Sequence, residues 1–396
     1  MLFFQSWFWT FAGVAVLGYW VCPRRLKLYW LVAASSVFQY HFAGPAGMAP
    51  ILALGVFTYC VALAVSGGGL RWLFTVAWVT LVAALAFYKY GDFAAANGQL
   101  LLRGVGVGLP AWLTDWKQPA APLGISFFTF EFVHYLYEVR ARGRAPVRNP
   151  FHFALFAVFF PTLAAGPIKR FPDFVPQLAA LANPPAATIW LAVRRIIRGL
   201  FKKVCIADLL LEPIHVFENV PNFNGPLVVI LAVVQGFRIY YDFSGYTDIA
   251  IGLAQLFNLR IPENFDRPYF STSLQEFWRR WHMSLSTWIR DYIYIPLGGN
   301  RAHRALNLLT AMAICGLWHG AAWNFALWGV YHGLGLVAEA GVRRVFPSLF
   351  RDSLLHRVVG WLVCYSFVCY GWLIFFYPID TLWRMTRGLL IWRYVG

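Results

Sequence analysis

Two histidines stand in the most chemically distinctive part of the sequence. His282 lies in EFWRRWHMSLSTWIRDYIYIPLGG, residues 276–299, and His319 lies in GLWHGAAWN, residues 316–324. An imidazole has an unperturbed pKa of about 6.5, so it can accept a hydroxyl proton near neutral pH. Ionisable groups are costly inside a membrane and usually mark a functional path, so these histidines are candidates for a reaction centre in a largely apolar chain.

Side chains near these histidines in the sequence are candidates for the walls and supports of that centre. The candidates are Trp278, Trp281, Trp318, Asp291, Asn324 and Tyr246. Asp291 can pair with the neighbours of Arg290 in a structural network, which is favoured over direct involvement. The role of Asn324 is open, and Tyr246 either lines a cavity or links two helices.

Two further histidines have a structural interpretation. His134 follows Glu131 at i, i+3 spacing in an apolar segment, which favours a local pair. His332 lies several helical turns beyond His319, so a continuing helix would separate the two side chains. The sequence has no HExxH motif and no carboxylate–histidine cluster that indicates a metal, so we expect no metal site.

The composition identifies an integral membrane protein. Of 396 residues, 60% are hydrophobic and 13% are charged, whereas soluble domains have about 25% charged residues. The apolar segments are continuous and do not alternate, which favours helices over a β-barrel. A spanning helix needs about 20 residues, so we expect an all-α polytopic membrane protein with about 10–12 transmembrane helices in one domain, residues 1–396.

The distribution of basic residues predicts the orientation. The apolar segments lie at 3–21, 28–43, 50–66, 70–90, 122–139, 151–168, 187–211, 226–241, 244–258, 305–322, 324–340 and 355–377. Arg24 and Arg25 follow the first segment, and Arg140 and Arg142 follow the fifth. By the positive-inside rule these loops are cytoplasmic and the N-terminus is extracytoplasmic. The same rule accounts for the net charge of +16, so we expect membrane lipid and no nucleic acid as a partner.

The segment 187–211 departs from the pattern of plain spans. Arg194, Arg198 and Lys202 recur every fourth residue and therefore share one helix face. This spacing favours an amphipathic helix at the cytoplasmic surface. A docking patch for an acidic partner or for coenzyme phosphates is the functional alternative.

Residues 260–304 are too rich in charge for an ordinary span. Such a segment is tolerated at membrane depth only where protein or water surrounds it. We expect short helices and re-entrant turns at the floor of a cavity, with a turn at Gly298 and Gly299 after Pro296. That turn would bring His282 and His319 to one water-accessible cavity.

The motifs resemble those of the membrane-bound O-acyltransferase (MBOAT) family. The resemblance is to the bacterial branch that contains the alginate O-acetylation and teichoic-acid D-alanyl transfer proteins. The matching blocks are PLGISFFTF at 122–130, AGPIKR at 165–170, YDFSGYTDI at 241–249, residues 264–299 and residues 316–333. The resemblance spans about residues 120–335, and its most specific blocks contain the two histidines.

The resemblance implies a helical bundle around a central tunnel and an enzyme that transfers an acyl group to a hydroxyl. His319 matches the presumed general base, and His282 matches a second polar position that is His or Asn. The family implies no tightly bound cofactor, with acetyl-CoA or an acyl carrier protein as the thioester co-substrate. It further implies a bacterial cytoplasmic (inner) membrane location, an extracytoplasmic polysaccharide or partner acyltransferase as acceptor, and a possible acidic carrier protein on the cytoplasmic face.

The acyl group is open between acetyl and D-alanyl. The RRWH and PLGG motifs are more similar to the polysaccharide-acetylating proteins, whereas the chain length and residues 160–171 are more similar to the D-alanyl proteins. We favour acetylation of an exported cell-envelope polysaccharide. A non-enzymatic transporter or scaffold with a histidine proton relay is the alternative of another class, although the sequence lacks the paired carboxylates and inverted repeats that would favour it.

Overall fold

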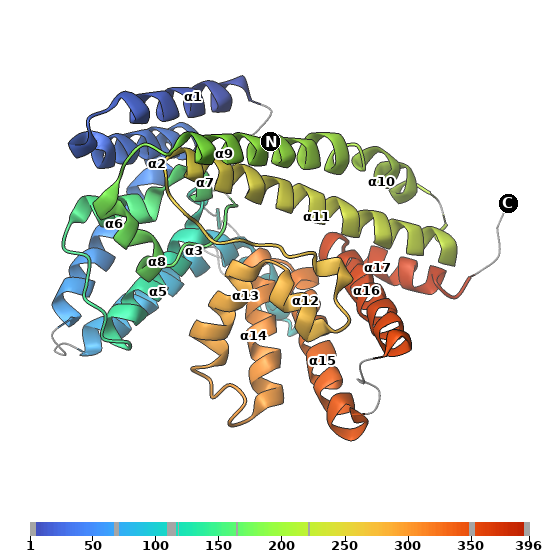
Figure 1. Cartoon of the computed structure of the whole chain (residues 1–396). Coiled ribbons are helices and arrows are strands. Elements are labelled where there is room, and N and C mark those ends of the chain that lie inside the picture. Colours follow the sequence, from blue (N-terminus) through green and yellow to red (C-terminus); the bar gives the residue numbers. More distant parts are fainter. Residues whose placement is uncertain are drawn as a thin grey trace. The chain divides into compact units, whose positions relative to one another are not determined.

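The computed structural model describes residues 5–66, 71–108, 116–117, 119–163, 165–220, 222–347 and 353–391 (Figure 1). Within these ranges every regular element is a helix, which confirms the all-α prediction. Contacts divide the chain into two compact units. One unit is Met1–Ile196 with Ala250–Pro262, and the other is Ile197–Ile249 with Glu263–Gly396.

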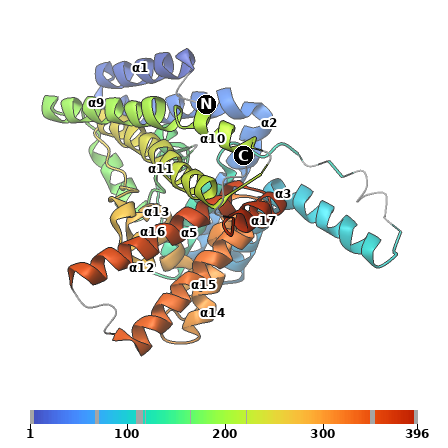
Figure 2. The same ribbon diagram turned by 90° about the vertical axis from the view of Figure 1, so that its right-hand side faces the viewer.

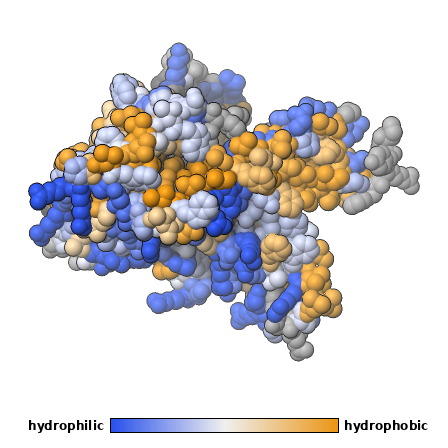
Figure 3. All heavy atoms as spheres, turned by 45° about the horizontal axis from the view of Figure 1, so that its top comes forward, coloured by the Kyte–Doolittle hydropathy of each residue, from blue (hydrophilic) through white to orange (hydrophobic). Residues whose placement is uncertain are grey.

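Several helices are suited to cross a membrane. Within the described ranges, the five long enough and apolar enough are Arg24–Val65, Trp72–Gly104, Gly225–Leu256, Trp323–Val345 and Leu354–Phe376, and Ser6–Val21 is a shorter apolar helix. Large apolar side chains such as Leu17, Val79 and Val363 are exposed on these helices, and Figure 3 shows wide hydrophobic areas on the viewed face. Apolar exposure on this scale indicates surfaces covered by lipid, so the chain is a multi-pass membrane protein.

The first unit is organised around one long bent helix. Its helices are α1 (Ser6–Val21), α2 (Lys27–Val65), α3 (Arg71–Gly104), α5 (Ile125–Arg140), α6 (Pro150–Val158), α7 (Phe160–Leu163) and α8 (Phe171–Phe174). α2 packs against α3, α5 and α6, and a non-helical residue, Gly44, divides it directly after the predicted span 28–43, so the spans at 28–43 and 50–66 correspond to its two parts. Gly44 has a φ of 62° inside α2, so the chain bends before Pro45 without a loop.

A buried ion pair holds the core of this unit. Lys169 Nζ donates to Glu131 Oε1 at 2.6 Å and to Thr162 Oγ1 at 2.7 Å, and the two charged side chains are only 2% and 4% exposed. His134 is fully buried nearby, and its Nε2 accepts the N–H of Phe171 at 2.9 Å. His134 therefore accepts a backbone N–H, whereas Glu131, which the sequence pairs with His134, forms its ion pair with Lys169.

The second unit contains the elements that carry both candidate histidines. Its helices are α10 (Leu211–Glu218), α12 (Leu274–Arg280), α13 (Met283–Ile289), α14 (Arg304–His319), α15 (Trp323–Val345), α16 (Leu354–Phe376) and α17 (Ile379–Gly388), while α9 (Ala186–Leu200) and α11 (Gly225–Leu256) run through both units. Figures 1 and 2 show α14 and α15 side by side. A Cβ on Gly316 would lie 2.2 Å from Phe325 O, and one on Gly329 would lie 2.3 Å from Met312 O. The two helices therefore approach each other where they lack side chains.

α11 is one continuous helix where the sequence predicts two spans, at 226–241 and 244–258. Asp242 and Asp248 interrupt the apolar run in the sequence, yet both lie inside the helix. Its 32 residues would extend about 48 Å, longer than the roughly 30 Å hydrocarbon core. α11 therefore has room for polar residues as well as a membrane span.

Basic residues at the end of α9 and in the turn that follows neutralise these carboxylates. Asp248 accepts Arg198 Nη2 at 3.1 Å and Lys202 Nζ at 2.7 Å. Lys203, in a π-helical turn, pairs with Asp242 and with Asp208. Two residues of the predicted basic face, Arg198 and Lys202, thus hold α11 inside this unit.

The segment between α11 and α14 consists of short pieces, as the sequence predicts. α12 and α13 have 7 residues each, and the chain also forms a π-helical turn at Arg290–Tyr294. Gly298 and Gly299 have φ values of 114° and 56°, so the predicted turn lies at these glycines. Left-handed backbone of this kind favours glycine.

Candidate active site

His282 lies between two short helices and is fixed by Asn264. Its backbone has φ 42° and ψ 53°, a left-handed conformation that separates α12 from α13. His282 Nδ1 lies 3.3 Å from Asn264 Oδ1, and the same oxygen accepts the N–H of Ser284 at 3.2 Å. The Met283 N–H donates to the Asn264 carbonyl at 3.0 Å. Asn264 therefore sets both the turn and the direction of the ring.

This hydrogen-bond network assigns the tautomer of His282. The Asn264 Oδ1 atom is an acceptor because a backbone N–H donates to it. His282 Nδ1 must then carry the proton, which leaves Nε2 as an acceptor. The side chain is 1% exposed. Burial lowers the pKa of the His282 imidazole well below its usual range, and His319 lowers it further, so the ring stays neutral.

His319 is the last residue of α14 and lies in an aromatic surrounding. Its ring centroid lies 5.0 Å from Trp318, 5.3 Å from Trp328 and 5.2 Å from Phe375. Unlike His282, it is only partly buried. The close contact of α14 with α15 sets its position, because Trp328 belongs to α15.

Trp318 connects the two histidines. Its ring centroid lies 6.0 Å from that of His282 and 5.0 Å from that of His319. Two imidazoles from separate motifs thus lie near the same indole ring. The ring centroid of Phe243, in α11, lies 4.6 Å from that of His282 in an edge-on arrangement.

Trp278 and Trp281 belong to a second layer of rings. Trp281 lies 4.8 Å from Trp372, and Trp278 lies 5.7 Å from Trp328 and 5.2 Å from His332. His332 is therefore part of the aromatic packing, with its side chain fully buried. These rings support the elements that carry the two candidate histidines.

The remaining candidates are Asn324, Asp291 and Tyr246. Asn324 Nδ2 donates to the Phe375 carbonyl at 2.7 Å and so holds the ring that packs on His319. Asp291 pairs with Arg290 at 2.7 Å, in line with the structural interpretation. Tyr246 lies within α11 and is partly buried, so of its two alternatives the link between helices is excluded.

Asn264 and Phe243 are residues near His282 that the sequence analysis does not indicate as site residues. Asn264 begins one of the motif blocks, but nothing in its local pattern shows that the side chain turns toward a histidine beyond the next helix. Phe243 occurs in an apolar run and carries no separate signal. Within the described residues, no group of three or more His, Cys, Asp or Glu side chains could hold a metal ion.

Comparison with known proteins places this chain in one class of membrane enzymes. The profile described as "MBOAT, membrane-bound O-acyltransferase family" matches residues 139–379. The chain belongs to this family, as its motifs indicate.

Relatives from both branches are similar along most of their length. "Probable alginate O-acetylase AlgI" of Azotobacter vinelandii is 37% identical over 387 residues, which cover 94% of this chain and 74% of that protein. "Peptidoglycan O-acetyltransferase" of Helicobacter pylori is 32% identical, over 92% of this chain and 75% of that protein. "Teichoic acid D-alanyltransferase" of Streptococcus thermophilus is 30% identical, over 66% of this chain and 69% of that protein.

Proposed function

We propose that this protein transfers an acetyl group from a cytoplasmic thioester donor to hydroxyls of an exported cell-envelope polysaccharide, or to a relay partner. The observation that carries the proposal is the pair His282 and His319 beside Trp318, in a chain that belongs to an acyltransferase family. The donor is acetyl-CoA or an acyl carrier protein, with no tightly bound cofactor. The location is a bacterial inner membrane with an extracytoplasmic N-terminus.

His319 is the general base in this proposal because it is less buried than His282. Its imidazole takes the proton of the acceptor hydroxyl as the oxygen attacks the thioester carbonyl carbon. A tetrahedral intermediate forms, the carbon–sulfur bond breaks, and the thiolate takes the proton back from the imidazolium. The products are an ester and a free thiol, and the base is regenerated.

The tautomer of His282 suggests its part in the reaction. Since Nδ1 donates to Asn264, Nε2 is free of a proton and can accept a hydrogen bond from the acceptor hydroxyl or from an N–H of His319. An atom without a proton cannot donate to the oxyanion of the intermediate. His282 therefore orients a reacting group, and other donors stabilise the oxyanion.

D-alanyl transfer from a carrier protein is the second candidate. It is favoured by the similarity to a "Teichoic acid D-alanyltransferase" at 30% identity. Acetyl transfer comes first because the relatives named alginate O-acetylase are similar over more of the chain, at up to 37% identity. A carrier protein as donor would dock on the cytoplasmic face by charge complementarity.

Membrane vesicles that contain the protein can separate these candidates. Vesicles are supplied with radiolabelled acetyl-CoA, acetyl-loaded carrier protein or D-alanyl-loaded carrier protein, and with alginate, peptidoglycan fragments or teichoic acid as acceptors. We expect hydroxylamine-labile label on the acceptor from an acetyl donor, and background label with the His319→Ala protein. Label only from the D-alanyl donor would establish the second candidate, and no transfer from any donor would contradict both.

A further inference from the structure

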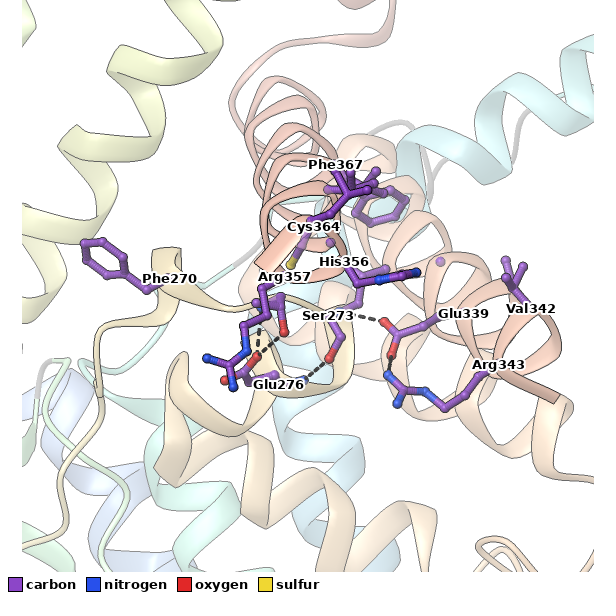
Figure 4. A pocket seen from close by; sticks show the side chains of 18 residues that line it. Phe270, Ser273, Glu276, Glu339, Val342, Arg343, His356, Arg357, Cys364 and Phe367 are labelled. Carbon is purple, nitrogen blue, oxygen red and sulfur yellow. Dashed lines mark hydrogen bonds and ion pairs between the residues drawn. The ribbon is translucent and has the colours of Figure 1, made fainter. Parts of the chain in front are cut away.

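A cavity of about 1010 Å³ lies between α15, α16 and the segment that leads into α12. Figure 4 shows Glu339 of α15 directed toward Ser273 and the start of α12, with Arg343 on its other side. Only 13% of the Glu339 side chain is exposed. A carboxylate held at this depth needs strong hydrogen-bond donors.

The donors are the first backbone amides of α12. Glu339 Oε2 accepts the N–H of Leu274 at 2.6 Å and that of Gln275 at 3.4 Å. Ser273 Oγ accepts the next amide, from Glu276, at 3.1 Å. The first amides of a helix have no partner within the helix, so side chains must supply acceptors. Here an acid from another helix caps α12.

This cap matters for the stability of α12 because the helix is short. It contains 7 residues, and isolated helices below about 12–15 residues are marginal even with good sequences. Its last turn leads directly to His282, since the Trp281 N–H donates to Phe277 O at 2.8 Å. A displacement of α12 would therefore displace the histidine.

The same helix, α15, also supports the other histidine. Trp328 of α15 packs against His319 at 5.3 Å, and Glu339 lies farther along α15 at the cap of α12. α15 thus contacts both α12, which leads to His282, and His319 itself. The distance between the two imidazoles depends on both contacts.

We propose that Glu339 is a positioning residue that, by capping α12, holds His282 at its working distance from His319. The proposal rests on the function proposed above for the two histidines. Glu339 acts through α12 and contacts neither imidazole. Arg343 pairs with Glu339 Oε1 at 3.3 Å but makes no part of the cap, because the capping oxygen is Oε2.

The test compares Glu339→Ala with Glu339→Gln, which keeps an acceptor oxygen, and with Arg343→Ala, which removes the ion-pair partner and leaves the capping oxygen in place. The first readout is kcat and KM for acetyl transfer in vesicles. The second is modification of His282 by diethyl pyrocarbonate in the full-length protein, measured by mass spectrometry. We expect Glu339→Ala to lower kcat by about 10- to 100-fold with little change in KM, because small displacements of reacting groups have effects of this size.

The same variant should raise His282 modification severalfold, whereas Glu339→Gln should restore most of both signals and Arg343→Ala should match the wild type. Wild-type kcat and wild-type labelling in Glu339→Ala would overturn the proposal, as would equal losses in the alanine and glutamine variants. If Glu339→Ala does not accumulate in the membrane, Ser273→Ala weakens the same helix end, and wild-type values there would also overturn it. If the wild-type protein transfers no acyl group, the proposed function fails, while the labelling still tests the cap.

Discussion

His282 Nδ1 and Asn264 Oδ1 lie 3.3 Å apart, and this contact joins a residue that precedes α12 in the chain to one that follows it. The Asp266 N–H also donates to the Arg280 carbonyl at 3.0 Å, so the chain before α12 runs along the end of that helix. The ring of His282 is therefore oriented by the segment that precedes the helix. A candidate base partner that is fixed in this way needs little reorganisation before reaction.

Asn264→Ala should lower acyl transfer by about 10- to 100-fold because the acceptor that fixes the His282 tautomer is lost. The measurement is initial rate in vesicles at equal protein abundance. Thr247→Ala is a control, since Thr247 Oγ1 accepts a hydrogen bond from Asn264 Nδ2, the other end of the same amide, at 3.4 Å. A wild-type rate in Asn264→Ala would show that this hydrogen bond is not used.

Asn264→Asp should move the acid limb of the pH–rate profile to higher pH. In the wild type, burial and His319 lower the pKa of His282, so the neutral ring persists as the pH falls below 6.5. A carboxylate at 264 would favour the imidazolium and raise that pKa, so the neutral ring would be lost earlier on acidification. An acid limb that stays in place would mean that titration of His282 does not govern the rate.

His319→Ala should reduce transfer by at least about 100-fold, the usual contribution of a general base. Membrane insertion and abundance should stay near the wild-type level because His319 is only partly buried. Transfer to a defined acceptor and immunoblotting of membranes are measured together. A well-expressed variant with the wild-type rate would remove His319 from the reaction.

His282→Asn should keep more activity than His282→Ala. The amide of asparagine can accept a hydrogen bond in place of Nε2, whereas alanine offers none. Rates are compared at matched abundance, with retention of fold checked by size-exclusion chromatography in detergent. Equal rates for the two variants would indicate that hydrogen bonding at this position is unimportant.

Gly329→Ala should destabilise the α14–α15 pair by about 1–3 kcal/mol, because the new Cβ meets backbone that must shift. That Cβ would lie 2.3 Å from Met312 O. Gly341→Ala is the matched control on α15, since its Cβ meets nothing within 4 Å. The control should be neutral or more stable by about 0.5–1 kcal/mol. Thermal unfolding in detergent distinguishes them, and equal melting temperatures would refute the close-packing argument.

Lys169→Met should cost about 3–5 kcal/mol because it leaves the buried Glu131 carboxylate without its cation. The double variant Lys169→Met, Glu131→Gln should recover part of this loss, since no buried charge remains. Unfolding of both proteins in the same detergent gives the comparison. A double variant that is no more stable than the single one would show that charge is not the cause.

The sequence predicts the helical class and the pair of histidines because both depend on local signals. Hydropathy reveals apolar helices, and the motifs around His282 and His319 are specific by themselves. The predicted helix boundaries are wrong near Asp242 and Asp248, where two spans are predicted and one helix is observed. Their charges are neutralised by Arg198, Lys202 and Lys203, and hydropathy along one segment does not register such partners.

The supports of the site are the part that sequence reasoning misses. Asn264 acts on His282 across a helix, and Glu339 caps a helix 65 residues earlier in the chain. Such contacts arise from packing and leave no periodic pattern. The predicted span at 151–168 fails for a local reason, because the backbone leaves the helical region at Phe159 and the chain forms α6 and α7 instead.

The left-handed backbone of His282, with φ 42°, restricts which amino acids evolution or a mutant library can place there. Among residues other than glycine, asparagine, aspartate and histidine are the ones enriched in this conformation, while β-branched residues are strongly disfavoured. In a saturation library at 282, many variants would therefore fail because they disfavour this backbone conformation, whatever their side-chain chemistry. Glycine would adopt the conformation but offers no hydrogen-bonding side chain. Comparing glycine with asparagine at 282 would therefore separate the requirement of the backbone from that of the reaction.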